Sequence, residues 1–202
     1  MAPDLPSDDG SAGCGTYARV VAAALEAVDD EIVVVGHSLG GLTAPLVAAE
    51  RPVSRLVFLC ALIPLPGRSW REQFAADPSM IAPGFGRGLA SDDQGRTFWS
   101  DHNAAAESMY GDCPESEVEF ALARLRPQAQ APYTEASTLA RWPDVPMTYI
   151  TAREDRVVSA AWGQRAAVER LSAQVIDLPG SHSPFLSRPE ALAALLDEIA
   201  TS

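Results

Sequence analysis

Three residue types in this chain could together carry out nucleophilic acyl transfer: a serine, a histidine and a carboxylate. The serine is Ser38, which lies in "GHSLGG" directly after the apolar run "EIVVV". A G-x-S-x-G string between a strand and a helix is typical of a nucleophile elbow, a sharp turn that exposes the serine hydroxyl. Small residues must flank such a turn, so Gly36 and Gly40 are expected to relieve its crowding. The same string also occurs in turns without a catalytic role, so the interpretation needs partner residues.

A serine hydroxyl is a weak nucleophile unless a base removes its proton, and the chain offers three histidines. His37 is adjacent to Ser38, and its ring is expected to point elsewhere. His102 falls in a helical stretch, where a surface or helix-capping role is the usual one. His182 lies in "LPGSHSPF", directly after an apolar strand-like run, and loops at the carboxyl ends of strands are where α/β proteins build their sites. His182 is therefore the candidate base.

The base needs a carboxylate that orients its ring. The strand-like run "PMTYITA" is followed by "REDRVV", which offers Glu154 and Asp155. Both acids could simply form a solvated turn beside Arg153 and Arg156, and that interpretation is retained for Glu154. Asp155 is the candidate acid. With it, the chain carries a serine, then an acid, then a histidine, which is the order found in proteins with such elbows.

The helix expected after the elbow adds two further predictions. It should direct its free N–H groups at the turn, and the N–H of Leu39 is the candidate donor to a developing oxyanion. Pro45 lies within this helix and cannot donate a hydrogen bond to the carbonyl of Gly41, which predicts a local kink.

The elements that must position these residues alternate between helix and strand. Residues 16–28 carry a helical stripe, with Thr16 as the N-cap. A final helix follows "SRPE", with Ser187 as its N-cap and an inward stripe of leucine and isoleucine. Continuous apolar runs predict strands within residues 31–36, 55–63, 146–152 and 173–180. The inward stripe of the final helix consists of Leu192, Leu195, Leu196 and Ile199. This alternation predicts an α/β fold with a mostly parallel sheet flanked by helices.

Residues 64–143 are different in character and are interpreted as a helical cap inserted over the sheet. The core of the fold would then consist of a first part, residues 1–63, and a second part, residues 144–202. Helices are predicted around residues 101–110 and within residues 114–125. The large apolar side chains of this insertion could line a ligand pocket or form the insertion's own core; the candidates are Trp70, Phe74, Phe98, Trp99 and Met109.

Composition narrows the classes of partner. Fifteen basic and 27 acidic residues give a net charge of −12, and an acidic surface repels the phosphates of nucleic acids and anionic membranes. No apolar run approaches the roughly 18 residues of a membrane span, and no secretory leader is visible, so a cytoplasmic protein is expected. The three cysteines, Cys14, Cys60 and Cys113, form neither a disulfide framework nor a zinc motif, so no metal site is predicted.

The motifs "GHSLGG" with Ser38, "AREDRVV" with Asp155 and "GSHSPFLSRPEALA" with His182 together resemble the α/β-hydrolase superfamily. "LVFLCALIP" and "YGDCPESEVEFALARLRPQ" are similar to its branch of small esterases, which includes plant methylesterases and hydroxynitrile lyases. The resemblance covers nearly the whole chain and implies an α/β-hydrolase fold with a cap. It also implies two-step cleavage of a small carboxylic ester: Ser38 attacks, His182 shuttles protons, Asp155 holds His182, and water releases the acid. No metal or organic cofactor is implied.

The start of the chain departs from this family. A stretch similar to "APDLPSDD" follows earlier strands there, whereas here it follows Met1. Those strands are expected to be missing, together with a His-Gly loop that supplies a second oxyanion N–H, and losing one donor costs on the order of 100- to 1000-fold in turnover. The strand from Ile32 to Val35 would become an apolar sheet edge, which we expect a homodimer to cover. A true start upstream of Met1 is the other explanation.

Two alternatives to the esterase remain open from sequence. A thioesterase or a lyase could use the same three residues, because they do not choose the leaving group. A truncated, weakly active or inactive hydrolase could act as a binding protein instead. The absent oxyanion loop favours the binding protein, and the complete Ser, Asp, His set disfavours it.

Overall fold

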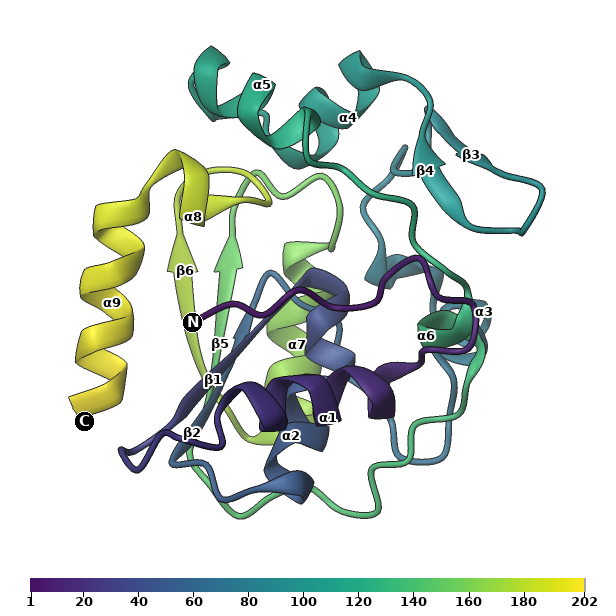
Figure 1. Cartoon of the computed structure of the whole chain (residues 1–202). Coiled ribbons are helices and arrows are strands. Elements are labelled where there is room, and N and C mark those ends of the chain that lie inside the picture. Colours follow the sequence, from purple (N-terminus) through teal and green to yellow (C-terminus); the bar gives the residue numbers. More distant parts are fainter. Residues whose placement is uncertain (202) are drawn as a thin grey trace.

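The computed structural model describes residues 1–201, and its centre is a sheet of four parallel strands (Figure 1). The strands are β1 (Val33–His37), β2 (Arg55–Leu59), β5 (Met147–Ala152) and β6 (Gln174–Leu178). They lie in the order β1-β2-β5-β6, and each neighbouring pair is parallel. The four apolar runs thus form the predicted strands, because continuous aliphatic sequence suits strands that are covered on both faces.

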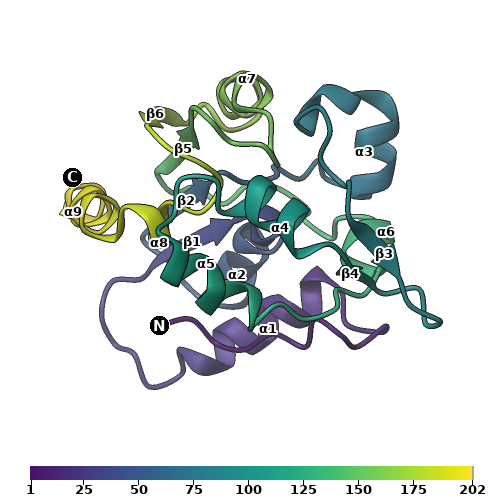
Figure 2. The same cartoon turned by 90° about the horizontal axis from the view of Figure 1, so that it is seen from above.

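Helices cover both faces of the sheet, and strand β2 shows how its side chains divide between them. Leu56 and Phe58 join the larger core cluster, which includes residues of α1, α2 and α7. Val57 and Leu59 point to the opposite face, because side chains alternate along a strand, and pack with Leu192 of α9. Figures 1 and 2 show α9 on one side of the sheet and the other three helices on the other. The helices are α1 (Cys14–Ala24), α2 (Ala44–Glu50), α7 (Ala160–Leu171) and α9 (Pro189–Thr201).

The segment between β2 and β5 places α4, α5 and a β-hairpin beyond the carboxyl ends of the strands (Figures 1 and 2). Helices α4 and α5 fall within the two predicted ranges, whereas the hairpin was not predicted because its strands are too short for a recognisable alternation. The segment contains α3 (Trp70–Ala76), η2 (Pro78–Met80), β3 (Leu89–Ser91), β4 (Thr97–Trp99), α4 (His102–Met109), α5 (Glu115–Leu122) and α6 (Ala131–Thr134). The division of the chain into core and cap at residues 64 and 143 stays our interpretation.

The predicted start of the first helix is wrong. Helix α1 begins at Cys14, with Gly13 as its N-cap, so Thr16 lies inside the first turn. The N–H of Cys14 donates to the carboxylate of Glu135, which is 121 residues away in sequence. A Cβ at position 13 would overlap that same carboxylate, at 1.8 Å from its Oε2. A tertiary partner thus caps this helix, and no local sequence signal could indicate it.

Two other helix predictions also need correction. Helix α2 begins one residue before Pro45, which places the proline in the first turn. The first turn tolerates proline, since its N–H groups lack partners within the helix, so Pro45 lies at the start of α2 and not in its interior. Ser187 ends the short helix α8 (Pro184–Ser187) and does not cap α9. The inward stripe of α9 is as predicted: Leu192 and Ile199 are buried, and Leu195 and Leu196 pack against the same cluster.

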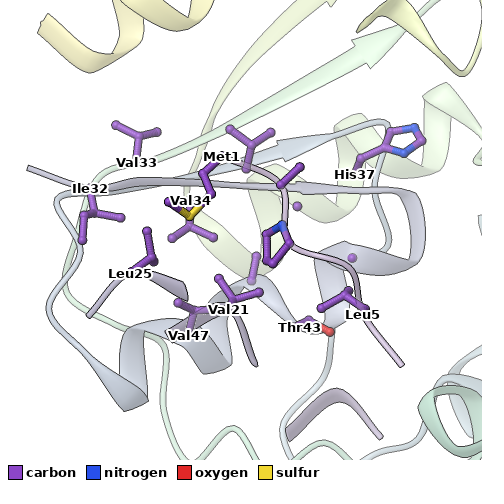
Figure 3. Close-up of a pocket in the computed structure, with 16 residues that line it drawn as sticks. Met1, Leu5, Val21, Leu25, Ile32, Val33, Val34, His37, Thr43 and Val47 are labelled. Carbon is purple, nitrogen blue, oxygen red and sulfur yellow. The ribbon is translucent and has the colours of Figure 1, made fainter. Parts of the chain in front are cut away.

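Strand β1 forms an edge of the sheet, as the sequence predicted. The carbonyl of Ile32 accepts from the N–H of Ser54 at 2.8 Å, so alternation turns the backbone groups of Val33 and Val35 toward the open edge. Residues 1–5 run beside β1 across an aliphatic cavity of about 310 Å³ (Figure 3). Within the described chain, no backbone hydrogen bond joins them to β1. The side chain of Val35 remains 40% exposed.

Among residues 1–201, none of the helices is long and apolar enough to cross a membrane.

Candidate active site

Asp155 and His182, the predicted acid and base, lie side by side. Asp155 follows β5 and His182 follows β6, and these strands are parallel neighbours whose carboxyl ends meet at one edge of the sheet. Nδ1 of His182 is 3.0 Å from Oδ1 and 2.9 Å from Oδ2 of Asp155. Since a carboxylate only accepts, Nδ1 carries the hydrogen, and the neutral ring then has its lone pair on Nε2.

The surroundings of this pair fix both side chains. Oδ1 of Asp155 also accepts from the N–H groups of Val157 at 2.8 Å and Val158 at 3.1 Å. The side chain of Asp155 is 2% exposed and that of His182 is 0% exposed. Nε2 of His182 is buried and has no hydrogen-bond partner within residues 1–201. A buried acceptor without a partner is costly, and such an atom is free to take a proton from a reacting group.

Ser38 lies at the turn between β1 and the 3₁₀ helix η1 (Ser38–Leu42). Its φ is +53°, in the left-handed region that side chains other than glycine rarely adopt. The carbonyl of Ser38 accepts from the N–H of Leu62 at 3.0 Å, which ties the turn to the segment after β2. Such a strained backbone conformation persists only where surrounding contacts hold it in place, and it is found most often at functional sites.

The glycines around Ser38 differ from the prediction. A Cβ on Gly36 would lie 2.8 Å from both the Gly40 carbonyl oxygen and the Cβ of Ala44, so Gly36 is needed as expected. A Cβ on Gly40 would meet nothing within 4 Å, so Gly40 relieves no crowding. Gly41 takes that role instead, because its Cβ would lie 2.0 Å from the carbonyl oxygen of Leu62. The close approach that shapes this turn is therefore between Gly41 and the segment after β2.

His37 has a role that sequence reasoning missed. Its Nε2 donates to the backbone carbonyl of His182 at 2.9 Å, and the two ring centroids are 4.6 Å apart. Burial, and then repulsion by His182, lower the pKa of His37 to about 3, although the hydrogen bond to the His182 carbonyl opposes this. The ring is therefore neutral near pH 7 with its hydrogen on Nε2. Its position next to Ser38 in sequence was the only available signal.

The candidate oxyanion donor, the N–H of Leu39, lies at the start of η1. The first N–H groups of a helix have no acceptor within it, so this group is available to a ligand. His102 is exposed at the start of α4. Glu154 is exposed too, and its carboxylate accepts from the N–H of Gly180 at 2.5 Å.

A cavity of about 310 Å³ opens at Ser38. Aromatic and aliphatic side chains of the segment between β2 and β5 form most of its wall, and a few polar side chains accompany them. Four of the five predicted pocket residues line it. The fifth, Phe74, does not, and its ring stacks on that of Trp70 with ring centroids 5.1 Å apart. The apolar lining is Trp70, Phe85, Leu89, Phe98, Trp99, Met109, Leu125, Tyr133 and Val157.

Cys60 lies beside Asp155 and His182, the candidate acid and base. One ligand-type atom each from Cys60, Asp155 and His182 falls within 4.8 Å of the other two. Burial, and then the charge of Asp155, raise the pKa of the Cys60 thiol far above its usual range. A metal would need the thiolate, and Asp155 is already engaged by two N–H groups and by His182. The chemistry of these donors fits the candidate acid–base pair better than a metal site.

A model described as the alpha/beta hydrolase family matches residues 1–195 of the chain. The chain belongs to this family. Its curated relatives include a pyrethroid hydrolase of Sphingobium wenxiniae, 29% identical over 215 residues, which cover 98% of this hydrolase and 76% of the relative. The pimeloyl-[acyl-carrier protein] methyl ester esterase of Xanthomonas campestris pv. campestris is 30% identical over 195 residues, 87% of this hydrolase and 73% of the relative. This hydrolase is accordingly an enzyme of the esterase type.

The plant relatives are more distant. A putative chloroplastic methylesterase of Arabidopsis thaliana is 24% identical over 187 residues, and the hydrolase spans only 53% of its length. The fold is shared with the crystal structure of a pyrethroid hydrolase from Sphingobium faniae JZ-2, at a TM-score of 0.76 and 24% identity, covering 100% of this hydrolase and 85% of that chain. Polyneuridine aldehyde esterase has a TM-score of 0.70 at 21% identity, with 93% and 80% covered.

Proposed function

We propose that this α/β hydrolase cleaves a small carboxylic ester through Ser38, His182 and Asp155. The observation that carries the proposal is the buried pair of Asp155 and His182. In this pair Nδ1 of His182 is hydrogen-bonded to Asp155, and Nε2 has no hydrogen-bond partner within residues 1–201. Asp155 fixes the tautomer whose Nε2 can accept a proton, which is the role of the acid in this class of mechanism. The left-handed backbone of Ser38 and the cavity beside it support the nucleophile.

The reaction would run in two balanced steps. Oγ of Ser38 attacks the ester carbonyl carbon while Nε2 of His182 takes its proton; His182 then gives that proton to the alkoxide as the C–O bond breaks and the alcohol leaves. Water attacks the acyl-enzyme in the same way, losing one proton to Nε2, and the proton returns to Ser38 as the acid leaves. The N–H of Leu39 stabilises the negative carbonyl oxygen in both steps.

The cavity at Ser38 supports an ester with an apolar acyl or alcohol group. Its volume of about 310 Å³ and its aromatic wall suit a small molecule better than a polymer. The names of the relatives point the same way, since they include a pyrethroid hydrolase and methyl ester esterases. A thioesterase or lyase with the same residues is the alternative, because the catalytic residues do not select the leaving group. A cytoplasmic location stays a prediction.

The experiment is to measure hydrolysis of p-nitrophenyl esters of increasing acyl length by the wild type and by Ser38→Ala. His102→Ala is the matched control, because His102 is exposed at the start of α4. We expect Ser38→Ala to lose at least 1000-fold in kcat and His102→Ala to keep the wild-type rate. A folded Ser38→Ala that retains wild-type hydrolysis would overturn the proposal. Cleavage of a matched thioester at more than ten times the ester rate would favour the thioesterase.

We also propose that two copies of this hydrolase associate through β1. The support is the open edge of β1, the exposed side chain of Val35 and the adjoining aliphatic cavity (Figure 3). An unpaired apolar strand edge is a template for pairing, and a two-fold axis lets the same edge pair with itself. Light scattering should give a dimer for the wild type and a monomer for Val35→Lys. A wild-type monomer at micromolar concentration would contradict the dimer proposal and leave the esterase proposal unaffected.

A further inference from the structure

The loop that carries His182 is fastened to a different partner at each of its residues. The carbonyl of Pro179 accepts from Nε of Arg188 at 3.0 Å. Gly180 exchanges two hydrogen bonds with Glu154, one to the side chain at 2.5 Å and one from the backbone N–H at 3.0 Å. These contacts fix the start of the loop to the core elements around it.

The next residue of the loop is held from the segment between β2 and β5. Ser181 donates its hydroxyl hydrogen to Oδ1 of Asp112, which lies in the turn between α4 and α5. Oδ2 of Asp112 is 3.5 Å from Nη2 of Arg188. Asp112 thus binds the loop that carries His182, at the position directly before His182.

The surroundings keep Asp112 ionised and close to the loop. Burial opposes its ionisation, but hydrogen bonds from Ser181, with the nearby charge of Arg188, outweigh burial and lower its pKa. Gly180 has a φ of +109°, and a Cβ there would lie 2.4 Å from Oδ2 of Asp112. Gly180 is therefore needed at this position, because any side chain there would collide with the carboxylate of Asp112.

The same segment also meets the substrate cavity. Met109, the last residue of α4, lines the cavity at Ser38, and Asp112 follows it in the turn. A ligand in the cavity that packs against Met109 therefore contacts the stretch of chain that presents Asp112. An error of about 1 Å in the placement of a reacting group can cost about 100-fold in rate, so the anchoring of this loop matters for turnover.

We propose that Asp112 is a positioning residue that couples the segment between β2 and β5 to His182 through the hydroxyl of Ser181. The proposal rests on the esterase function above. In this proposal Asp112 helps to orient His182 and does not contact the substrate. Removing the carboxylate frees Ser181 and lets the loop relax, so the proton transfer by Nε2 slows while substrate binding is largely retained.

The test compares Asp112→Ala with Glu107→Gln. Glu107 makes the matched contact: it lies on α4 and forms an ion pair of 2.7 Å with Arg156, which also links this segment to the loop after β5. Among residues 1–201, neither side chain of this ion pair forms a hydrogen bond with residues 179–182. We expect Asp112→Ala to lower kcat about 10- to 100-fold with KM changed less than about threefold. Glu107→Gln should keep both constants within twofold of the wild type.

Two further variants keep the test decisive if Asp112→Ala folds poorly. Asp112→Asn retains an oxygen that can accept from Ser181 and should recover most of kcat. Ser181→Ala should reproduce the loss, and the double variant should be no worse than the worse single variant, because both single variants remove the hydrogen bond between Ser181 and Asp112. Equal kcat losses in Asp112→Ala and Glu107→Gln, or losses that multiply in the double variant, would overturn this proposal. Failure of the esterase proposal is separate, since hydrolysis would then survive Ser38→Ala.

Discussion

Gly41→Ala tests the account of how the turn at Ser38 is built. The added Cβ would lie 2.0 Å from the carbonyl oxygen of Leu62 and 2.9 Å from the Cβ of Ala61. The nearest of these atoms is backbone, so no flexible side-chain end can move aside. Relief requires the two segments to separate, which breaks the hydrogen bond of 3.0 Å from the N–H of Leu62 to the carbonyl of Ser38.

The cost can be worked from these contacts. Overpacking costs about 1–3 kcal/mol, and the lost hydrogen bond adds about 1 kcal/mol. For a chain of this length, 1 kcal/mol shifts Tm by about 2–4 °C, so a cost of about 2–4 kcal/mol should lower the Tm of Gly41→Ala by about 4–16 °C. The control is Gly40→Ala in the same turn, where the added Cβ meets nothing within 4 Å. Gly40→Ala should stay within about 2 °C of the wild type.

Thermal unfolding followed by circular dichroism measures both variants. The same samples should show slower ester hydrolysis for Gly41→Ala than for Gly40→Ala, because Ser38 shares the displaced turn. If the two variants unfold within 2 °C of each other, the close approach between Gly41 and Leu62 does not shape the turn, and the reasoning fails.

Three other predictions follow from the site. Asp155→Asn should lose about 10³- to 10⁴-fold in kcat with little change in Tm, since the amide oxygen can still accept from the N–H of Val157; a loss below tenfold would contradict the assignment of the acid. The pKa of His37 is lowered from about 6.5 to about 3, so the unfolded state protonates first and stability falls as pH drops through that window. Urea denaturation at pH 7 and 4.5 should show a smaller loss of stability for His37→Gln than for the wild type, and equal losses would refute this. Burial, and then Asp155, raise the pKa of Cys60, so mass spectrometry after treatment with a disulfide reagent should find Cys60 modified only when urea unfolds the chain; rapid modification of the native protein would contradict it.

The sheet and the pairing of Asp155 with His182 could be predicted from sequence for a physical reason. Continuous apolar runs separated by helical stretches permit few arrangements other than a parallel sheet, whose strands end at a common edge. Residues that directly follow two such strands then lie near one another when the strands are neighbours. Asp155 and His182 satisfy this condition because β5 and β6 are paired.

Other features could not be predicted, because they depend on residues that are distant in sequence. Glu135 caps α1 from 121 residues away, so the local cap signal at Thr16 misplaced the helix start. The role of Gly41 depends on the approach of Leu62. His37 was expected to point elsewhere because sequence shows only its adjacency to Ser38, whereas its partner is the backbone of His182.

Covalent labelling by a fluorophosphonate tests most directly whether Ser38 is the activated nucleophile. The wild type, Ser38→Ala and His182→Ala are incubated with the probe, and the modified peptide is identified by mass spectrometry. The account predicts one probe on Ser38 in the wild type, none in Ser38→Ala and much slower labelling in His182→Ala. A folded wild type that stays unlabelled, or that is labelled equally in Ser38→Ala, would contradict it.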